Sequence, residues 1–382
     1  MPVKNRFAEL HDDITAWRRD IHAHPELLFD TERTSALVAE KLREFGCDEV
    51  VTGIGVTGVV GVIKGKTDTA GRTIGLRADM DALPIVEATG LEYASKTPGK
   101  MHACGHDGHT AMLLGAAQYL SETRNFDGTA VVIFQPAEEG GGGGREMVND
   151  GMMERFGIDE VYGMHNWPGV PVGAFAIRPG PFFAAADRLD IKITGRGGHA
   201  AKPHETVDAT VVASHVILAL QTIASRNVDP TKQVVVSITS FHTDSVAQNV
   251  ISQVAHLQGT VRTHDPEIQD LAEERVKAIC TQVASAFGAT AEVIYERDYP
   301  VTRNHEEHTG YAADAARAVS GACDEDAPLV MGGEDFSFML NERPGAYILV
   351  GNGDTAHVHH PEYNFNDEVI PAGCSWFAEI VE

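Results

Sequence analysis

Apolar residues along this chain recur with two different periods, one typical of strands and one typical of helices. Short apolar runs predict β-strands at 58–63, 72–76, 129–134, 160–164 and 346–350. Amphipathic helices are predicted at 7–23, 32–45 and 109–122. Strands that alternate with helices favour a mostly parallel sheet covered by helices. We therefore expect an α/β domain with a mixed, mostly parallel sheet.

The order of elements changes between residues 188 and 297. Strands are predicted at 188–195, 233–241, 255–262 and 291–296, and helices at 206–225 and 266–287. The resulting order, β-α-β-β-α-β, is the split βαβ or ferredoxin-like arrangement, which forms a complete two-layer domain. Helix and strand patterns resume after it. We therefore expect residues 188–297 to be inserted into a larger domain made of 1–187 and 298–382.

Length and charge limit the kinds of partner that this protein can have. Its 382 residues accommodate two domains, because single cores usually stop growing near ~250–300 residues. The formal net charge of −25 repels phosphodiester backbones and anionic lipids, so we expect neither nucleic acid nor membrane partners. The five cysteines are odd in number and widely spaced, and the N-terminus is polar. These features predict a cytoplasmic protein that acts on small molecules.

The octapeptide HACGHDGH, residues 102–109, gathers three imidazoles, one thiol and one carboxylate. Such a cluster predicts a metal site to which it contributes two or three ligands, while the fold brings in the others. The remote candidates are Glu138, Glu139, His165, His359 and His360. Thiolate, imidazole and carboxylate suit Zn²⁺, and Mn²⁺, Co²⁺ and Ni²⁺ are alternatives. For Cys104, a core position or a nucleophile paired with a histidine is the other interpretation.

Some of the remote candidates directly follow predicted strands. The run 129–134 leads to Glu138 and Glu139, and the run 160–164 leads into His165. Ligand sites in open α/β sheets lie beyond the carboxyl ends of strands. Adjacent carboxylates can take different roles, one binding metal and the other facing the substrate. The alternative for Glu138 and Glu139 is a solvated acidic pair.

His199 lies in GRGGHAAKPH, just after the first strand of the predicted insertion. The flanking glycines predict an exposed turn, because glycine adopts turn conformations without steric cost. His199 is thus either a functional side chain or an ordinary solvent-facing histidine.

Seven motifs occur in a fixed order along the chain. They are RADMDALP from Arg77, HACGHDGH from His102, QPAEEGGGG from Gln135, GMHNWP from Gly163, GRGGHAAKPH from Gly195, GGEDFSF from Gly332 and VHHPEYNFND from Val358. Together they resemble the hippurate hydrolase and auxin-conjugate amidohydrolase branch of the aminoacylase-type metallopeptidases. This resemblance covers nearly the whole chain. It implies a catalytic α/β domain with an inserted lid or dimerisation domain, in agreement with the split βαβ insertion.

The resemblance also implies roles for individual residues around a metal centre. The implied metal ligands are Cys104, His106, Glu139, His165 and His359. Glu138 would be the general base, and Asp79 an acid that orients a ligand. Many relatives carry a metal-binding histidine at the position of Arg77. This chain departs from them, as its own branch does, and we expect Cys104 to compensate.

Three further residues are implied to contact the substrate. His199 would stabilise the tetrahedral oxyanion from a partner subunit, so a homodimer or higher homo-oligomer is expected. Asn249 and Arg262 would bind the free carboxylate of the substrate, for which arginine offers a bidentate fork. The implied substrate is an N-acyl amino acid, such as hippurate or an N-acetyl- or indole-acetyl-amino acid.

The predicted function is therefore a metal-dependent amidohydrolase that cleaves a linear amide. We expect two divalent ions per subunit, manganese or zinc, with cobalt or nickel as alternatives. A dipeptidase or aminopeptidase of the same mechanism is the second hypothesis. A non-catalytic metal-binding protein is the third, which Glu138 argues against because a pure binding site has no use for a carboxylate beside a ligand.

Overall fold

The computed structural model describes residues 4–382 and divides into two compact units. The larger unit comprises residues 4–180, 303–328 and 335–382, and the smaller comprises 181–302 and 329–334. The chain passes between them four times: at β7 (Gly180–Phe183), at β14 (Thr302–Asn304) and on either side of residues 329–334. The smaller unit contains the predicted insertion, 188–297, extends beyond it at both ends and takes in 329–334.

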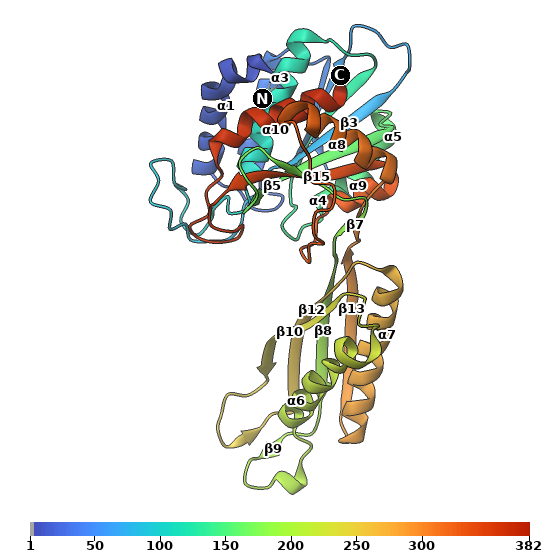
Figure 1. Ribbon diagram of the computed structural model, residues 1–382. Helices are drawn as coiled ribbons and strands as arrows, with labels where there is room; N and C mark the ends of the chain where they lie inside the picture. The colour runs from blue at the N-terminus through green and yellow to red at the C-terminus, as the bar shows by residue number, and fades with distance from the viewer. Residues whose placement is uncertain (1–3) are drawn as a thin grey trace. The chain divides into compact units, whose positions relative to one another are not determined.

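The larger unit is built on a seven-stranded sheet (Figure 1). Its strands, in spatial order, are β1 (Glu49–Ile54), β2 (Gly58–Lys64), β4 (Thr129–Gln135), β3 (Thr73–Asp79), β5 (Glu160–Pro168), β15 (Gly345–Gly353) and β6 (Phe175–Ala176). The neighbours β4, β3, β5 and β15 are parallel, whereas the pairs β1–β2, β2–β4 and β15–β6 are antiparallel. The predicted α/β fold with a mixed sheet is therefore confirmed, and its parallel part is the central run of four strands.

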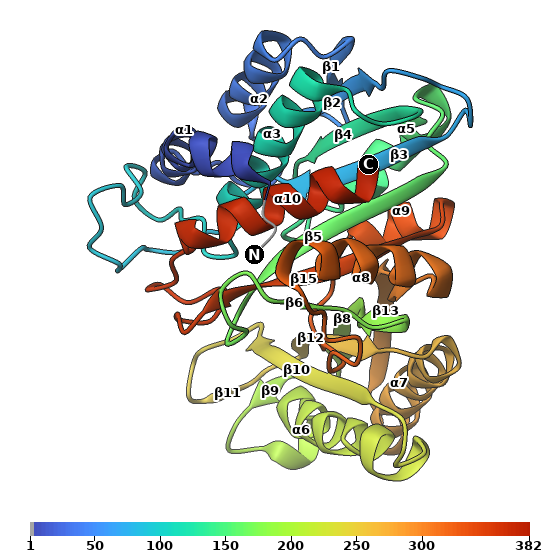
Figure 2. The same ribbon diagram turned by 45° about the horizontal axis from the view of Figure 1, so that its top comes forward.

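Helices cover the sheet of the larger unit. They are α1 (Asn5–Ala23), α2 (Glu32–Glu44), α3 (His106–Thr123), α4 (Gly143–Asn149), α5 (Met152–Arg155), α8 (Glu306–Ser320), α9 (Phe336–Glu342) and α10 (Ile370–Val381), with a 3₁₀ turn at Asp367–Val369. Figure 2 shows α1, α3 and α10 side by side against the sheet, where their apolar faces form one core with the strands. Helices α4 and α9 contact each other and the strands β4, β5 and β15.

Close packing at the start of α3 depends on a glycine. A Cβ atom at Gly108 would lie 2.2 Å from a ring carbon of Phe365, which is fully buried. Only a residue without a side chain allows this approach, because such overlap cannot be relieved in a packed core. The helix that follows the HACGHDGH motif is thereby packed against the segment that leads into α10.

Helix α10 was not predicted from the sequence. Its residues Ala372 to Ala378 are all buried, so the segment lacks the polar face that marks an amphipathic helix. Its residues pack in the same core as those of α3 and α8, and Trp376 donates a hydrogen bond to the backbone oxygen of Ala312.

The smaller unit is a four-stranded antiparallel sheet with two helices against it. Its strands, in spatial order, are β10 (Val234–Thr243), β12 (Val254–Thr263), β8 (Ala185–Thr194) and β13 (Thr290–Tyr299). The helices are α6 (Ala209–Leu220) and α7 (Pro266–Ala286), and the short elements are β9 (Gly198–His199), β11 (Val250–Ile251), a 3₁₀ turn at Pro203–Glu205 and a π turn at Ile223–Asn227. The chain order β8-α6-β10-β12-α7-β13 confirms the predicted split βαβ arrangement.

One helical stretch in the part of the chain that the structure describes, Ala209–Asn227, has the length and apolar composition of a membrane span. Its residues Val212, Val216 and Leu220 are buried in the core of the smaller unit, against the sheet and α7. One face of this stretch therefore packs in the two-layer domain, whereas Leu218 on another face is 69% exposed.

Candidate metal centre

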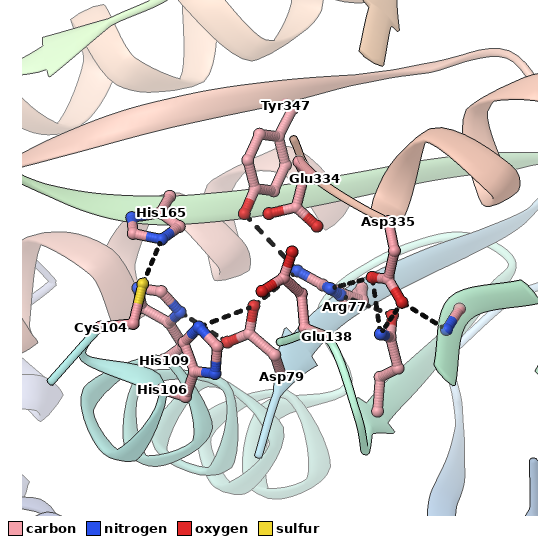
Figure 3. A network of polar contacts seen from close by, with 12 residues as sticks. Arg77, Asp79, Cys104, His106, His109, Glu138, His165, Glu334, Asp335 and Tyr347 are labelled. Atoms are coloured by element: carbon pink, nitrogen blue, oxygen red, sulfur yellow. Dashed lines mark hydrogen bonds and ion pairs between the residues drawn. The ribbon is translucent and has the colours of Figure 1, made fainter. Parts of the chain in front are cut away.

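The predicted metal ligands of the larger unit meet at one edge of its sheet. Strand β3 ends at Asp79, β4 is followed by Glu138 and Glu139, and β5 carries His165 near its carboxyl end. Because β3, β4 and β5 are parallel, these ends lie at the same edge, where α/β sheets place their ligand sites. Figure 3 shows the gathered side chains, with Cys104 facing His165.

Cys104 is shared by two groups of potential metal ligands. In the first, donor atoms of Cys104, His106 and His165 lie within 4.8 Å of one another; in the second, those of Cys104, Glu139 and His359 do. The Cys104 sulfur is 3.3 Å from Nε2 of His165, and Nε2 of His359 is 3.2 Å from Oε1 of Glu139. A shared thiol between two groups of donors is an arrangement that suits a pair of ions.

The octapeptide HACGHDGH divides its side chains between three environments. Cys104 and His106 belong to the donor cluster, and His109 forms a further group of potential donors with Asp79 and His106. The Nδ1 atom of His109 lies 2.6 Å from Asp79 Oδ1, and its Nε2 accepts from the backbone N–H of Asn166 at 2.9 Å. Asp107 accepts hydrogen bonds from α1 instead. Only part of the motif is therefore available to a metal, as the sequence predicted.

His106 is oriented as a ligand histidine. Its Nδ1–H donates to the backbone oxygen of Asp81 at 2.8 Å, which leaves Nε2 as the atom available to a metal. Burial opposes protonation of His106, but Asp79 and Asp81 outweigh it and raise the pKa of His106 to about 10, so a metal ion would replace the proton on Nε2. That Nε2 atom is buried and makes no hydrogen bond to any of residues 4–382 that the structure describes. A buried polar atom without a hydrogen bond is costly, and coordination to a metal ion would satisfy it. The donor set thus fits a divalent metal ion.

The electrostatics of the cluster also fit a cation. Burial, together with the negative charges of Glu139 and Glu138, raises the pKa of the Cys104 thiol well above its ordinary value. Burial and the neighbouring His109 lower the pKa of His165 well below its ordinary value, so this imidazole is neutral, as metal binding requires. A divalent ion would offset the negative charges that hold the thiol in its protonated form.

Arg77 forms buried ion pairs near the carboxyl end of β3. Its Nη1 donates to Asp79 at 2.7 Å, its Nη2 to Asp335 at 2.9 Å and its Nε to Gln135 at 2.9 Å. Burial opposes ionisation of Asp79, but His106, Arg77 and His109 outweigh it and hold the pKa of Asp79 well below its ordinary value. Asp79 stays ionised and hydrogen-bonds His109 rather than His106.

The other predicted site residues lie in the smaller unit. His199 is exposed on β9, and the adjacent Ala200 N–H donates to the backbone oxygen of Asn249 at 3.0 Å, so the two candidates are neighbours. Arg262 lies on β12 near Asp187, and burial lowers its pKa. Their predicted contacts with substrate stay predictions.

Several residues that shape the cluster escaped the sequence analysis. They are Asp81, His109, Asn166 and Asp335. An acidic residue just past the end of an apolar strand was the available signal for Asp81, as it was for Glu138. His109 was marked only as a member of the octapeptide, and its contact with Asp79 could not be read from the sequence, as the contacts of Asn166 could not, because both depend on distant residues.

Comparison with known proteins identifies the family. Residues 75–382 match the model of peptidase family M20/M25/M40. The chain belongs to this family. It is 42% identical to the hippurate hydrolase of Campylobacter jejuni over 97% of this chain and 96% of the relative. It is 41% identical to thermostable carboxypeptidase 1 of Saccharolobus solfataricus over 97% of this chain and 95% of that protein.

Solved structures agree with the family assignment. An aminohydrolase, described as putative, from methicillin-resistant Staphylococcus aureus has a TM-score of 0.89 at 34% identity and covers 99% of this chain and 97% of its own. A dinuclear metal binding peptidase of family M20 from Bacillus subtilis has a TM-score of 0.84 at 34% identity, with 98% of each chain covered. The predicted resemblance, the fold class and the class of enzyme, a metal-dependent amidohydrolase, are confirmed.

Next to His106, the buried residues His22, Arg18 and Asp107 form an ionic cluster that makes the stability of the protein depend on pH. Nδ1 of His22 lies 2.8 Å from Asp107 and its Nε2 lies 3.3 Å from Glu87, while Arg18 also approaches Asp107 at 3.4 Å. Burial lowers the pKa of His22, but Asp107 and Glu87 outweigh it and raise that pKa to about 9. His22 is therefore protonated at neutral pH.

We expect the stabilisation from His22 to be complete below pH 6.5 and lost as the pH rises to about 9, because the folded-state pKa exceeds the unfolded value. The loss should amount to about 3 kcal/mol of the free energy of unfolding. Urea unfolding of chelator-treated wild type and His22→Gln at pH 6 and pH 9.5 measures it. The difference between the two proteins should shrink at the higher pH, and a constant difference would contradict the assignment.

Proposed function

We propose that this enzyme hydrolyses N-acyl amino acids to a carboxylic acid and a free amino acid. The observation that carries the proposal is the gathering, at one sheet edge, of five potential ligands and one further buried carboxylate, Glu138. The ligands we propose are Cys104, His106, Glu139, His165 and His359. Glu138 also falls in two groups of potential donors, one with His106 and Glu139 and one with Glu334 and Asp335. We assign it to acid–base chemistry because Glu139 is the carboxylate that contacts His359 and groups with Cys104.

We propose two divalent ions per subunit, manganese or zinc, with cobalt or nickel as alternatives. One thiolate, three imidazoles and one carboxylate suit this group of borderline ions better than Mg²⁺ or Ca²⁺, which prefer oxygen ligands. When bound, such ions supply Lewis acidity that acidifies water and polarises a carbonyl group.

Glu138 performs the proton transfers of the proposed reaction. Its carboxylate takes a proton from the attacking water as the oxygen–carbon bond forms. The same group, now protonated, gives that proton to the amine nitrogen as the carbon–nitrogen bond breaks. Amide hydrolysis needs this second transfer, because an unprotonated amine anion is a very poor leaving group.

The substrate class follows from the relatives together with the smaller unit. Relatives include a hippurate hydrolase and an N-acyl-L-amino acid amidohydrolase of Geobacillus stearothermophilus, to which the chain is 42% identical over 83% of its own length and 85% of the relative's. Arg262 and Asn249 are proposed to bind the substrate carboxylate. Release of a C-terminal residue from a peptide is the second candidate, favoured by the 41% identity to a carboxypeptidase.

We also propose that the protein is a homodimer and that it is located in the cytoplasm. His199 would act on the active site of the partner subunit, where its imidazole donates to the developing oxyanion. The cysteines among residues 4–382 are all free thiols, as in a reducing compartment.

The substrate proposal is tested with a panel of acetyl-, benzoyl- and indole-acetyl-amino acids and free dipeptides. Chelator-treated enzyme should be nearly inactive, and Mn²⁺ or Zn²⁺ should restore hydrolysis of the acyl-amino acids because the ions supply the Lewis acid. Release of the free amino acid is the readout. Preference for dipeptides with a free amine would instead support the peptidase, and full turnover without metal would overturn the metal centre.

Glu138 and Glu139 form a matched pair of variants. Glu138→Gln should retain metal and fold but lose at least ~10²-fold in kcat, because the amide cannot accept the proton of water. Glu139→Gln should lose metal first. Metal content by elemental analysis, measured beside kcat, separates the two effects, and the opposite pattern would reverse the assigned roles.

Complementation tests whether His199 acts across subunits. His199→Ala should be nearly inactive with normal metal content, because it is none of the proposed ligands. Mixed with Glu138→Gln under conditions of subunit exchange, it should recover roughly a quarter of wild-type activity, since about half the dimers are mixed and each holds one complete centre. Confirmed heterodimers without activity would show that His199 serves its own subunit or none.

A further inference from the structure

The turn that carries Glu138 and Glu139 is held by one buried carboxylate. Oδ1 of Asp81 accepts the backbone N–H of Glu138 at 3.0 Å, and Oδ2 accepts the backbone N–H of Glu139 at 3.1 Å. Asp81 itself is 1% exposed. Hydrogen bonds from backbone N–H groups to a buried carboxylate are strong and directional. The backbone direction of two consecutive residues is therefore set by one side chain.

Asp81 also orients the histidine on the other side of the site. Its backbone oxygen accepts from Nδ1 of His106 at 2.8 Å, and its Oδ1 lies 3.5 Å from the same nitrogen. The positions of the proposed base and of two proposed ligands, Glu139 and His106, thus depend on contacts with the same residue, Asp81. A shift of Asp81 would move the base and these ligands relative to one another.

The turn needs such support because its conformation is strained. Ala137, directly before the acidic pair, has φ of 55°, in the left-handed region that residues with a side chain rarely occupy. Its N–H donates to the backbone oxygen of Leu28 at 3.1 Å, and the N–H of Gly144 donates to Asp335 at 2.8 Å. These bonds fix the ends of the segment, and Asp81 fixes its middle. Strained backbone persists only where surrounding contacts determine it.

We propose that Asp81 is a positioning residue for catalysis, which sets the placement of Glu138 relative to the ligands His106 and Glu139. The inference rests on the proposed function, because it assigns the base to Glu138. It goes beyond a structural role. Asp81 contributes through the geometry of the acid–base step, in addition to any contribution to folding.

Asp81→Asn is the direct test. An amide has one acceptor oxygen, and its NH₂ group would face a backbone N–H, so the turn must move. A displacement near 1 Å costs about 10²-fold in rate. We expect kcat to fall by about that factor with KM changed less than ~3-fold, because uniform substrate binding is untouched. Asp81→Ser, which keeps one acceptor and leaves room for a water molecule, serves if Asp81→Asn fails to fold.

Two readouts separate positioning from a general loss of structure. The visible spectrum of the Co²⁺-substituted protein should change in Asp81→Asn at full Co²⁺ occupancy, because His106 and Glu139 are displaced. In the double variant Asp81→Asn/Glu138→Gln, the loss of kcat should be smaller than the product of the single losses, since the residue acts partly through Glu138. A purely structural role predicts independent, multiplicative losses and an unchanged spectrum.

Asp127→Asn is the matched control. Asp127 accepts the backbone N–H of Thr69 at 2.8 Å and the hydroxyl of Thr67 at 2.6 Å, in a surface loop between α3 and β4. Its substitution should leave kcat and the Co²⁺ spectrum unchanged. If Asp81→Asn keeps wild-type kcat while Glu138→Gln is inactive, the positioning role is wrong and the proposed function stands. If Glu138→Gln is fully active, the proposed function itself has failed.

Discussion

The active region depends on one constraint, which is that several carboxylates are buried together near the carboxyl ends of the strands. Asp79, Asp81 and Asp335 are almost completely buried, and Glu138 is nearly so. Isolated buried carboxylates are too costly to retain, so each must find donors or positive charge. Arg77, backbone N–H groups and imidazoles supply part of this compensation. Bound cations supply the rest in a family whose members include a dinuclear metal binding peptidase.

Much of the donor set could be predicted because it follows the sheet. Glu139 and His165 lie at or just beyond the carboxyl ends of β4 and β5, and parallel pairing brings such positions together whatever the details of packing. His359 and His360 were both candidates from the sequence, and the family resemblance alone chose His359, since no strand or helix pattern distinguishes the two. Its left-handed backbone, with φ of 67°, and its N–H bond to Ala103 depend on the folded structure.

The division of labour inside HACGHDGH could not be predicted. The roles of its side chains depend on their partners, and these partners come from α1, β3 and β5. Asp107 pairs with His22 and Arg18, whereas His109 pairs with Asp79 and Asn166. Which way each side chain points depends on where α3 begins and on how closely Phe365 approaches Gly108. The sequence around the motif determines neither the first residue of α3 nor the contact with Phe365.

Arg18 has a consequence for the order in which the enzyme can mature. Its guanidinium joins Asp107, next to a proposed ligand, to Asp367, near the end of the chain. A chain still emerging from the ribosome therefore has its first helix and the HACGHDGH segment but lacks both Asp367 and His359. The centre that we propose therefore cannot form until residues 359–367 have been synthesised, so metal loading cannot precede that point of translation.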